Sequence, residues 1–457
     1  MTIEIDGEYT TAEVKIPKEH VEKSLQEEIQ EQVDNKAFQN RIVYMPDCHG
    51  GLGPQAIVGF SMPLGNRIIP NSVGGDIGCG MTAVRIDDVD VDFDDIDDLR
   101  DINSQTRSNI PMGTGRVNDH DEEFEELYPW SHANNTLKKL HNFLSSEQVG
   151  EHDYTEEKFD IEYFEDLCEK VGISEKYAKD SLASLGSGNH FIEISESQDN
   201  GSLWIVAHSG SRNLGQQVAS FHQEKAIEKR ESEVDWEAMS EEQKAYANAD
   251  GSPNWKQIRQ DFNGNEIEEL GNEIESFSPN NNRNTDLDYL EGEEMYNYLR
   301  DMIFTQEYAT HNRKMMAEYL ADILGSTIRE YINSPHNYVD FEDGIIRKGS
   351  TRSGEGEKFV VPMNMEDGTL LCRGKGNPDW HNSAPHGSGR LGSRGWARSE
   401  FDADEVRKRM YENGTYSAHV PGDEVPEAYK KTELIEKQIK PTAEVLDRLV
   451  PQMNFKA

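Results

Sequence analysis

The sequence predicts an α/β (α+β) fold, arranged as one large domain with mixed β-sheets and flanking helices. Short apolar runs bounded by turn residues predict strands, and apolar residues at helical spacing predict helices between them. The most unusual motifs are scattered from residue 47 to residue 386, and no internal repeat is present. Because these motifs can act together only if distant segments converge, we expect one interwoven domain over residues 1–457.

Helices and strands are predicted to alternate irregularly along the chain. Val21, Leu25, Ile29 and Val33 recur at helical spacing, which predicts an amphipathic helix over 17–35. Compact apolar segments predict strands at 41–45, 56–63, 67–70, 82–86 and 203–208. Periodicity predicts helices at 157–185, 214–230 and 296–331. Strands are expected again over 338–373, followed by a loop to residue 393 and a helical segment over 426–451.

Residues 231–294 are very polar and contain few aliphatic side chains. A segment with so little apolar surface is expected to contribute little to a core. We therefore expect an acidic surface insertion within the domain, acting as a lid or a mobile arm.

The chain is strongly acidic throughout, with 87 Asp and Glu against 46 Lys and Arg and a formal net charge of -41. Such a surface repels nucleic acid at low salt through its long-range field. At molar salt the Debye length falls to about 3 Å, and the repulsion becomes tolerable. We interpret the charge as adaptation to a salt-rich, halophilic cytoplasm, and it says little about the substrate.

Cysteine usage and hydropathy point to an intracellular protein. Cys48, Cys79, Cys168 and Cys372 are widely separated and form no disulfide or Cys-X-X-Cys pattern. No signal peptide opens the sequence, and no run of about 18 apolar residues is present. We expect a soluble cytoplasmic protein that does not enter a membrane, with a monomer as the default oligomeric state.

The segment 73–81, Val-Gly-Gly-Asp-Ile-Gly-Cys-Gly-Met, is a glycine-dense turn that carries Asp76 and Cys79. Its glycines allow the backbone to adopt positive φ and to pack closely around a ligand. A carboxylate and a soft thiolate together suit a divalent transition metal better than calcium or magnesium.

Three later histidines, His190, His208 and His336, also lie in settings rich in glycine or asparagine. Any one of them alone is more often an ordinary polar residue, but their joint occurrence with Asp76 and Cys79 favours a metal site. The thiolate of Cys79 can bridge two metals, and Glu193 is positioned to orient the His190 imidazole. The donor types suit Zn, Mn, Fe or Co without choosing among them.

A further histidine, His386, lies between Pro385 and Gly387 in a constrained loop. A histidine can attack phosphorus to give a covalent phosphoramidate. Residues 345–400 contain nine Lys and Arg against six Asp and Glu, a local charge of +3 that points to an anionic ligand. Several basic side chains are candidates to hold phosphates: Arg373, Lys375, Arg390 and Arg394. The alternative is a structural loop with surface arginines.

These motifs together resemble the RtcB family of RNA ligases. The resemblance rests on the segments 45–50, 73–81, 186–193, 208–215, 347–349 and 373–390, and it spans about 41–457. Gly-Asp-Ile-Gly-Cys-Gly-Met, Gly-Asn-His-Phe-Ile-Glu and Pro-His-Gly-Ser-Gly-Arg are its most specific parts. It implies an enzyme that joins a 2′,3′-cyclic phosphate or 3′-phosphate RNA end to a 5′-hydroxyl end through a GMP–histidine intermediate.

The resemblance also implies roles for particular residues. Two Mn²⁺ ions would be held by Asp76, Cys79, His190, His208 and His336. GTP would guanylylate His386, with Asp47 assisting nearby. The nucleotide would contact Asn189, Arg212, Ser383, Gly387, Gly389, Arg390, Tyr429 and Lys456, with Tyr429 packing against guanine and Lys456 bonding it. The implied partners are RNA, either tRNA halves in splicing or broken RNA in repair, and an archease-like activator.

One departure from the family pattern affects the nucleotide loop. Where the family has Pro-Gly-Ser-Met-Gly, residues 362–368 read Pro-Met-Asn-Met-Glu-Asp-Gly, which adds Glu366. An alternative function is therefore a metal-dependent RNA phosphoesterase that has lost guanylylation. A non-catalytic RNA-end or metal-binding protein is a third class, disfavoured by the complete ligand set and His386.

Overall fold

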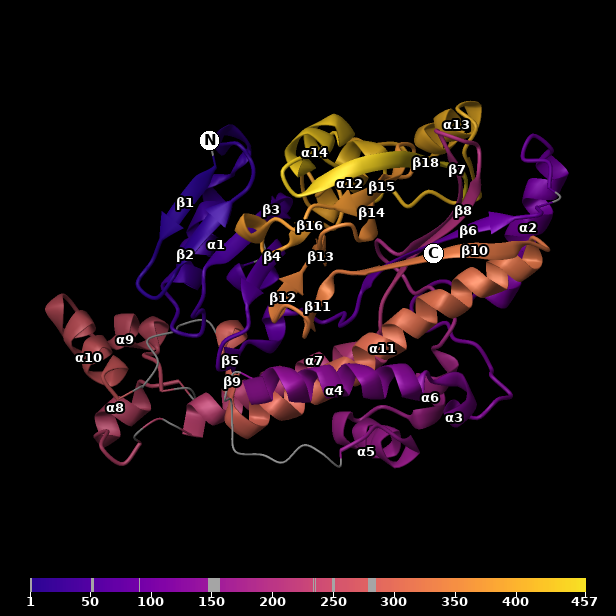
Figure 1. Ribbon diagram of the computed structural model, residues 1–457. Coiled ribbons are helices and arrows are strands. Elements are labelled where there is room, and N and C mark those ends of the chain that lie inside the picture. Colours follow the sequence, from indigo (N-terminus) through magenta and orange to yellow (C-terminus); the bar gives the residue numbers. More distant parts are fainter. Residues whose placement is uncertain are drawn as a thin grey trace.

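Two large β-sheets form the centre of the fold, as Figure 1 shows. The computed structural model describes residues 2–50, 53–89, 91–146, 157–232, 234, 236–248, 251–277 and 285–457. The first sheet has the order β1 (Ile3–Asp6), β2 (Thr11–Val14), β3 (Ile42–His49), β4 (Val58–Pro63), β12 (Ile345–Lys348) and β11 (Asn337–Asp340). Its β2–β3 pair is parallel and its other pairs are antiparallel.

The second sheet is larger; His208 lies within it, and Cys79, His190 and His336 each adjoin the end of one of its strands. Its order is β10 (Thr327–Pro335), β6 (Gly80–Asp87), β8 (Leu203–Ser209), β7 (Phe191–Ser197), β18 (Ala443–Phe455), β15 (Gly368–Gly374) and β14 (Lys358–Asn364), with β17 (Tyr416–Ser417) pairing with β18. Two small pairs complete the strands: β5 (Arg67–Ile68) with β9 (Leu290–Glu291), and β13 (Ser350–Arg352) with β16 (Ser383–Pro385). Mixed sheets with flanking helices confirm the predicted α/β class.

The long helix α11 (Gly292–Ile323) packs against β6, β8 and β10. It also contacts α7 (Arg212–Ser232), α4 (Trp130–Ser146) and α2 (Ile96–Asn109). The remaining helices outside the polar segment are α1 (Lys23–Val33), α3 (Phe124–Leu127), α5 (Ile161–Val171), α6 (Glu175–Asp180), α12 (Arg394–Glu400), α13 (Ala403–Glu412) and α14 (Thr432–Ile439). The main apolar cluster includes residues from Ala12 to Phe455, so both ends of the chain share one core.

Two predicted helices end earlier than expected, each beside a left-handed glycine. The segment 157–185 forms α5 and α6 separately, because Gly172 adopts a φ of 73° and caps α5. The segment 296–331 ends as a helix at Ile323, and Gly325, with a φ of 61°, turns the chain into β10. Glycine reaches this conformation without steric cost, so it stops a helix that apolar periodicity alone would continue.

The prediction of a helix over 426–451 is wrong for most of its length. Its α-helical part is Thr432–Ile439, preceded by a short 3₁₀ helix at Pro426–Ala428, and the chain then forms the strand β18. β18 pairs with β15 on one side and β7 on the other. Backbone pairing on both edges decides the conformation here, and it is a tertiary effect that sequence periodicity does not show.

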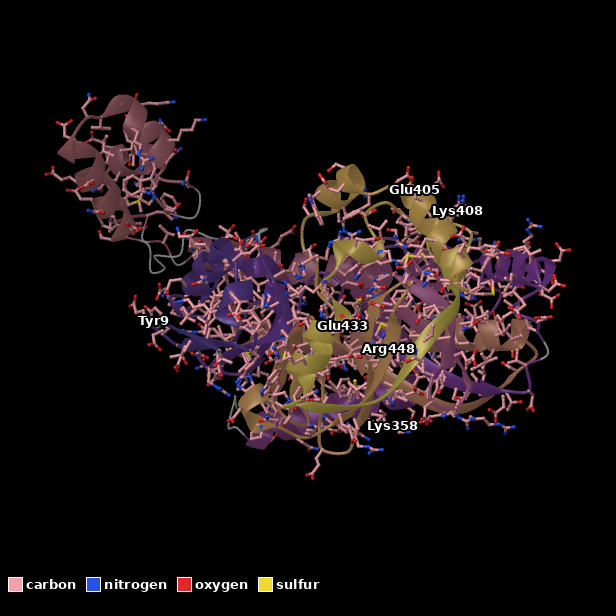
Figure 2. The ribbon with its side chains drawn as sticks, turned by 90° about the horizontal axis from the view of Figure 1, so that it is seen from above. Tyr9, Lys358, Glu405, Lys408, Glu433 and Arg448 are labelled. Carbon is pink, nitrogen blue, oxygen red and sulfur yellow. The ribbon has the colours of Figure 1, made fainter. Side chains whose placement is uncertain are left out.

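The polar segment forms a small helical lobe with α8 (Glu241–Ala245), α9 (Trp255–Asp261) and α10 (Asn265–Glu275), which stands off from the body in Figure 2. The expectation of little core is wrong for this lobe. Val234, Met239, Ile258 and Ile274 are buried together in an apolar cluster of their own.

Candidate active site

The glycine-dense turn that carries Asp76 and Cys79 lies between the 3₁₀ helix Pro70–Ser72 and β6. Gly78 has a φ of 71°, and a Cβ added there would lie 2.7 Å from the Cα atom of Gln306 on α11. Glycine is therefore required at position 78 because α11 packs directly against the turn.

Cys79 and three histidines converge from four separate segments. The Sγ atom of Cys79 lies 3.6 Å from Nε2 of His190 and 3.4 Å from Nε2 of His208. The Nε2 atom of His208 lies 3.4 Å from Nε2 of His336. All four residues are buried, and Cys79, His190 and His208 form a group that could hold a metal ion. The structure thus brings together the predicted ligand set.

Asp76 lies beside His190 and completes this group, and a hydrogen bond to the backbone holds the His190 ring. Its Oδ2 atom lies 3.1 Å from Nε2 of His190, while its Oδ1 atom accepts from the backbone N–H of Ser211 at 3.1 Å. His190 Nδ1 lies 3.0 Å from the carbonyl oxygen of Leu185, which assigns the ring proton to Nδ1. In this tautomer the neutral ring presents its Nε2 lone pair to Asp76 and Cys79, so that electron-pair donors point at one another. Such an arrangement fits a cation between them.

Burial shapes the ionisation of these donors. It raises the pKa of the Cys79 thiol well above its usual range, an effect that the nearby Asp76 carboxylate increases. Burial also lowers the pKa of His208 and His336, so both imidazoles are neutral and offer lone pairs. A divalent cation would supply the positive charge that a buried thiolate needs.

Arg313 on α11 fixes the backbone around these donors. Its fully buried Nη1 donates to the carbonyl oxygen of Gly78 at 2.7 Å and to that of Ser209 at 2.9 Å. It thereby ties the end of β8 to the turn that carries Cys79. Sequence analysis did not single out Arg313, because an arginine within a helix is ordinarily on the surface.

His386 is held by Asp47, which lies within β3 and not after it as predicted. The His386 Nδ1 atom is 2.7 Å from Oδ2 of Asp47, and the same oxygen accepts from the backbone N–H groups of His386 and Gly387. The His386 ring also packs edge-on against His336, with 4.8 Å between ring centroids. The candidate nucleophile therefore adjoins the candidate metal ligands.

A cavity of about 1110 Å³ opens beside His386, and most of the predicted nucleotide-binding residues line it. Those that line it are Asn189, His386, Gly387, Gly389, Arg390, Tyr429 and Lys456. Arg394 and Lys430 line it too, but the Lys430 ammonium donates to the carbonyl oxygens of Pro46 and Cys48.

Four predicted phosphate or nucleotide contacts lie elsewhere. Ser383 is buried and accepts from Arg347 Nε at 2.9 Å, so it supports the loop and does not reach the cavity. Arg373 pairs with Glu444, and Lys375 donates to a backbone carbonyl, both away from the cavity. Arg212 is outside the cavity lining; it begins α7 with a φ of 58° and donates to Ser184 Oγ.

Glu193 does not orient His190 as predicted. Its carboxylate accepts from Ser195 at 3.1 Å, Thr369 at 3.0 Å and Asn454 at 3.3 Å, and it lines the cavity. Burial raises the pKa of Glu193 to about 7. The spacing predicted a contact with His190, but β7 directs the two side chains differently.

Glu424 is a cavity residue that the sequence did not single out. Its carboxylate accepts from the Tyr429 hydroxyl at 2.6 Å, Lys456 Nζ at 3.0 Å and Arg390 Nη1 at 3.2 Å. Because the chain contains 87 Asp and Glu, nothing in the sequence distinguishes a buried glutamate from those on the surface.

The altered loop at 362–368 directs its extra charge away from the cavity. Glu366 forms a two-point ion pair with Arg409 on α13, at 2.8 and 3.1 Å. Pro362, Met363 and Asn364 line the cavity, and Ser388 Oγ holds the Met363 carbonyl at 2.6 Å. Glu366 therefore does not add a negative charge to the cavity lining.

Buried thiol, imidazole and carboxylate donors, a histidine held by a carboxylate, and an adjoining cavity with basic side chains are typical of a metal-dependent enzyme that acts on phosphate groups. The chain belongs to the RtcB family: residues 29–457 match the family described as tRNA-splicing ligase RtcB. This match confirms the resemblance drawn from the motifs and the assignment to the RNA ligases.

Relatives from bacteria and archaea cover most of the chain. The RNA-splicing ligase RtcB of Escherichia coli is 26% identical over 420 residues, which is 86% of this chain and 84% of the relative. The tRNA-splicing ligase RtcB of Nanoarchaeum equitans is 25% identical over 449 residues, covering 85% and 82%. That of Methanococcus maripaludis is 24% identical over 475 residues, covering 90% and 87%. Among the described residues, no helix has the length and apolar character needed to cross a bilayer.

Proposed function

We propose that this chain is a GTP- and Mn²⁺-dependent ligase that joins 2′,3′-cyclic phosphate or 3′-phosphate RNA ends to 5′-hydroxyl ends. The observation that carries the proposal is the position of His386, bonded to Asp47 at 2.7 Å and packed against His336 at the edge of the cavity. A nucleophile, a candidate metal cluster and a nucleotide-sized space thus adjoin one another.

His386 attacks the α-phosphorus of GTP through Nε2. Because Asp47 accepts the Nδ1 proton, the lone pair is on Nε2. The new P–N bond forms as the bond to the β-phosphate oxygen breaks and pyrophosphate leaves. The carboxylate of Asp47 stabilises the positive charge that develops on the ring.

The covalent GMP then passes to RNA. An oxygen of the RNA 3′-phosphate attacks the phosphorus bound to His386, and the P–N bond breaks. The 5′-hydroxyl of the second strand attacks the activated 3′-phosphorus, GMP leaves, and the strands are joined. Asn189, Arg390 and Arg394 line the cavity where phosphate charge accumulates, and Arg212 is proposed to contact phosphate from outside its lining.

The metal ions would be held by Asp76, Cys79, His190, His208 and His336, whose carboxylate, thiol and imidazole donors suit a divalent transition metal such as Mn²⁺. When bound, the ions would neutralise phosphate charge and lower the pKa of a water used to open the cyclic phosphate. The protein's own contribution is to fix these donors, through Leu185 for His190 and Arg313 for the turn.

Guanine is proposed to bind at the end of the cavity formed by Glu193, Tyr429 and Lys456. A lysine ammonium donates to the O6 acceptor of guanine, and a carboxylate accepts from its N1 and N2 hydrogens. The Tyr429 ring packs against the base. This set complements guanine on both its donor and acceptor edges.

The biological setting is proposed with the activity. We propose a cytoplasmic, monomeric enzyme that acts on tRNA halves or broken RNA, with an archease-like activator and a salt-rich cell interior. Residues 1–457 would form one catalytic domain, with the segment 231–294 as an acidic arm. The phosphoesterase alternative rests on the altered loop, and the charge that this loop adds, Glu366, pairs with Arg409 outside the cavity lining.

Labelling with GTP tests the proposal. The protein is incubated with Mn²⁺ and [α-³²P]GTP at low and at molar KCl, and acid-labile label on the protein is measured. We expect label on the wild type, none on His386→Ala, and normal labelling of His419→Ala, which changes an exposed histidine outside the cavity. An unlabelled wild type at both salt concentrations would overturn the proposal, and labelled His386→Ala would overturn the nucleophile assignment.

A further inference from the structure

The carboxylate of Glu424 lines a cavity that is proposed to receive a triphosphate. Because like charges repel, a carboxylate in that position calls for an explanation. We infer that Glu424 is a positioning residue that selects guanine over adenine by fixing the Lys456 ammonium toward position 6 of the purine. The inference rests on the proposed nucleotide site and names the residue that determines its base preference.

The contacts of Glu424 account for both of its oxygens. Oε2 accepts from Lys456 Nζ at 3.0 Å and from the Tyr429 hydroxyl at 2.6 Å. Oε1 lies 3.2 Å from Arg390 Nη1 and 3.3 Å from Arg394 Nη1. Glu424 is 2% exposed and Lys456 is 3% exposed, so this ion pair is shielded from water. Three cationic side chains, those of Lys456, Arg390 and Arg394, thus surround this buried carboxylate and offset the cost of its burial.

Lys456 needs such a partner because its side chain is intrinsically flexible. A lysine stem has several rotatable bonds and a compact head with three donors. β18 ends at Phe455, and Arg107 Nη2 holds the Lys456 carbonyl at 3.0 Å, which fixes the backbone but not the ammonium. Glu424 fixes the ammonium itself, and the Phe191 ring lies 5.7 Å from it.

A fixed ammonium distinguishes the two purines at one position. Guanine carries an oxygen acceptor at position 6, whereas adenine carries an amino group that donates. An ammonium has donors only, so it bonds the first and opposes the second. If the Lys456 ammonium were free to turn away, it would no longer disfavour the binding of adenine. Sites that pair buried polar groups discriminate strongly for this reason.

Glu424 also joins the base end of the cavity to the phosphate end. Arg390 contacts Glu424 and lies over the Tyr429 ring, with 5.2 Å to the centroid. One carboxylate therefore sets the positions of a group proposed to contact guanine and a group proposed to contact phosphate. A purely structural role for Glu424 predicts equal weakening of all nucleotides, whereas the inference predicts weakening specific to guanine.

Binding of two unreactive nucleotides separates these outcomes. α,β-Methylene-GTP and α,β-methylene-ATP cannot release pyrophosphate, so equilibrium dialysis with Mn²⁺ measures their Kd values without covalent labelling. We expect Glu424→Gln to lower the ratio Kd(ATP analogue)/Kd(GTP analogue) by about 10- to 100-fold, the effect of one charge-assisted hydrogen bond. The ratio is unaffected by the fraction of protein that is misfolded.

Three further variants show whether Glu424 acts through Lys456. Lys456→Met and the double variant with Glu424→Gln should both show the ratio of Glu424→Gln alone, because coupled residues are not additive. Glu424→Asp should recover part of the ratio. Glu427→Gln is the matched control. Glu427 lies three residues further on, in the 3₁₀ helix Pro426–Ala428, and pairs with Arg409 at 2.7 Å, outside the cavity lining. The Kd ratio of this variant should equal that of the wild type.

Each result has a distinct meaning. Any one of three results would overturn the inference. The wild type shows no preference for the GTP analogue, or Glu424→Gln keeps the wild-type Kd ratio. In the third, the double variant lowers the Kd ratio by the product of the two single-variant effects. A wild type that prefers the GTP analogue yet accepts no label from [α-³²P]GTP would instead contradict the proposed ligase function and leave the base preference standing.

Discussion

The Nδ1 atom of His386 lies 2.7 Å from Oδ2 of Asp47, although 339 positions separate the two residues in the chain. Two backbone N–H groups, those of His386 and Gly387, bond to the same oxygen. The carboxylate therefore fixes both the ring and the loop that carries it. This pair defines the nucleophilic atom of the proposed reaction.

Asp47→Asn should slow guanylylation by about 10²- to 10⁴-fold, because a neutral amide accepts the ring proton more weakly and lacks the charge that stabilises a positively charged ring. The rate of labelling by [α-³²P]GTP measures the effect. Asp379→Asn, which changes an exposed carboxylate in the 3₁₀ helix Pro378–Trp380, should label at the wild-type rate. Normal labelling of Asp47→Asn would remove Asp47 from the mechanism.

Cys79→Ala should remove the donor that lies within 3.6 Å of both His190 and His208. Without the thiolate, bound Mn²⁺ should fall below two ions per chain, and labelling should drop by at least about 10²-fold. Plasma mass spectrometry after dialysis gives the metal content. Cys372→Ala, a buried cysteine in a separate apolar cluster, is the control and should keep the full content. A full complement of metal in Cys79→Ala would refute the shared-ligand assignment.

The binding of the GTP analogue should weaken as the pH falls below 7. Burial raises the pKa of Glu193 to about 7, so the carboxylate accepts guanine hydrogens above that pH and is protonated below it. One proton linked to binding changes Kd by up to about tenfold per pH unit. Glu193→Gln should bind more weakly at pH 8 and lose this part of the pH dependence. Identical pH profiles for the two proteins would exclude Glu193 as the titrating group.

Glu366→Gln should change the KM for GTP by less than about twofold. The Glu366 carboxylate pairs with Arg409 outside the cavity, and partly exposed ion pairs contribute at most about 1 kcal/mol. The initial rate of labelling at increasing GTP concentrations gives the apparent KM. A tenfold change would show that the altered loop does govern nucleotide binding.

Asp301→Asn should destabilise the fold by about 3 kcal/mol, since it leaves buried donors without their anion. Asp301 on α11 accepts from Tyr163 at 2.5 Å, Lys170 at 2.5 Å and His222 at 2.6 Å. Urea unfolding at pH 7 measures the loss, and Asp322→Asn, an exposed position on the same helix, is the control.

The Asp301 carboxylate also makes the free energy of unfolding decrease at acid pH. Despite the opposing effect of burial, the partners His222 and Lys170 lower the pKa of Asp301 to about 2. The stabilisation is present above the ordinary carboxyl pKa and is lost as the pH falls toward 2. The variant should lack this decrease; a variant as stable as the wild type would refute the role.

The amino-acid sequence determined which residues stand out chemically. Asp76, Cys79 and His386 were found because carboxylate, thiol and imidazole groups in glycine-rich turns are unusual, and their order along the chain identified the family. Local signals of this kind depend only on residue type and near neighbours. The α/β class followed from the periods of the apolar pattern in the same way.

Only the tertiary structure decided which side chains meet. It turned Glu193 toward the cavity, buried Ser383 behind the loop, and gathered Lys456, Tyr429 and Arg390 around Glu424. These outcomes depend on strand pairing, above all on β18 between β7 and β15, which distant segments impose. A residue's local pattern does not record which face of a paired strand it will occupy, and burial of a charge depends on partners from other elements that only the fold brings together.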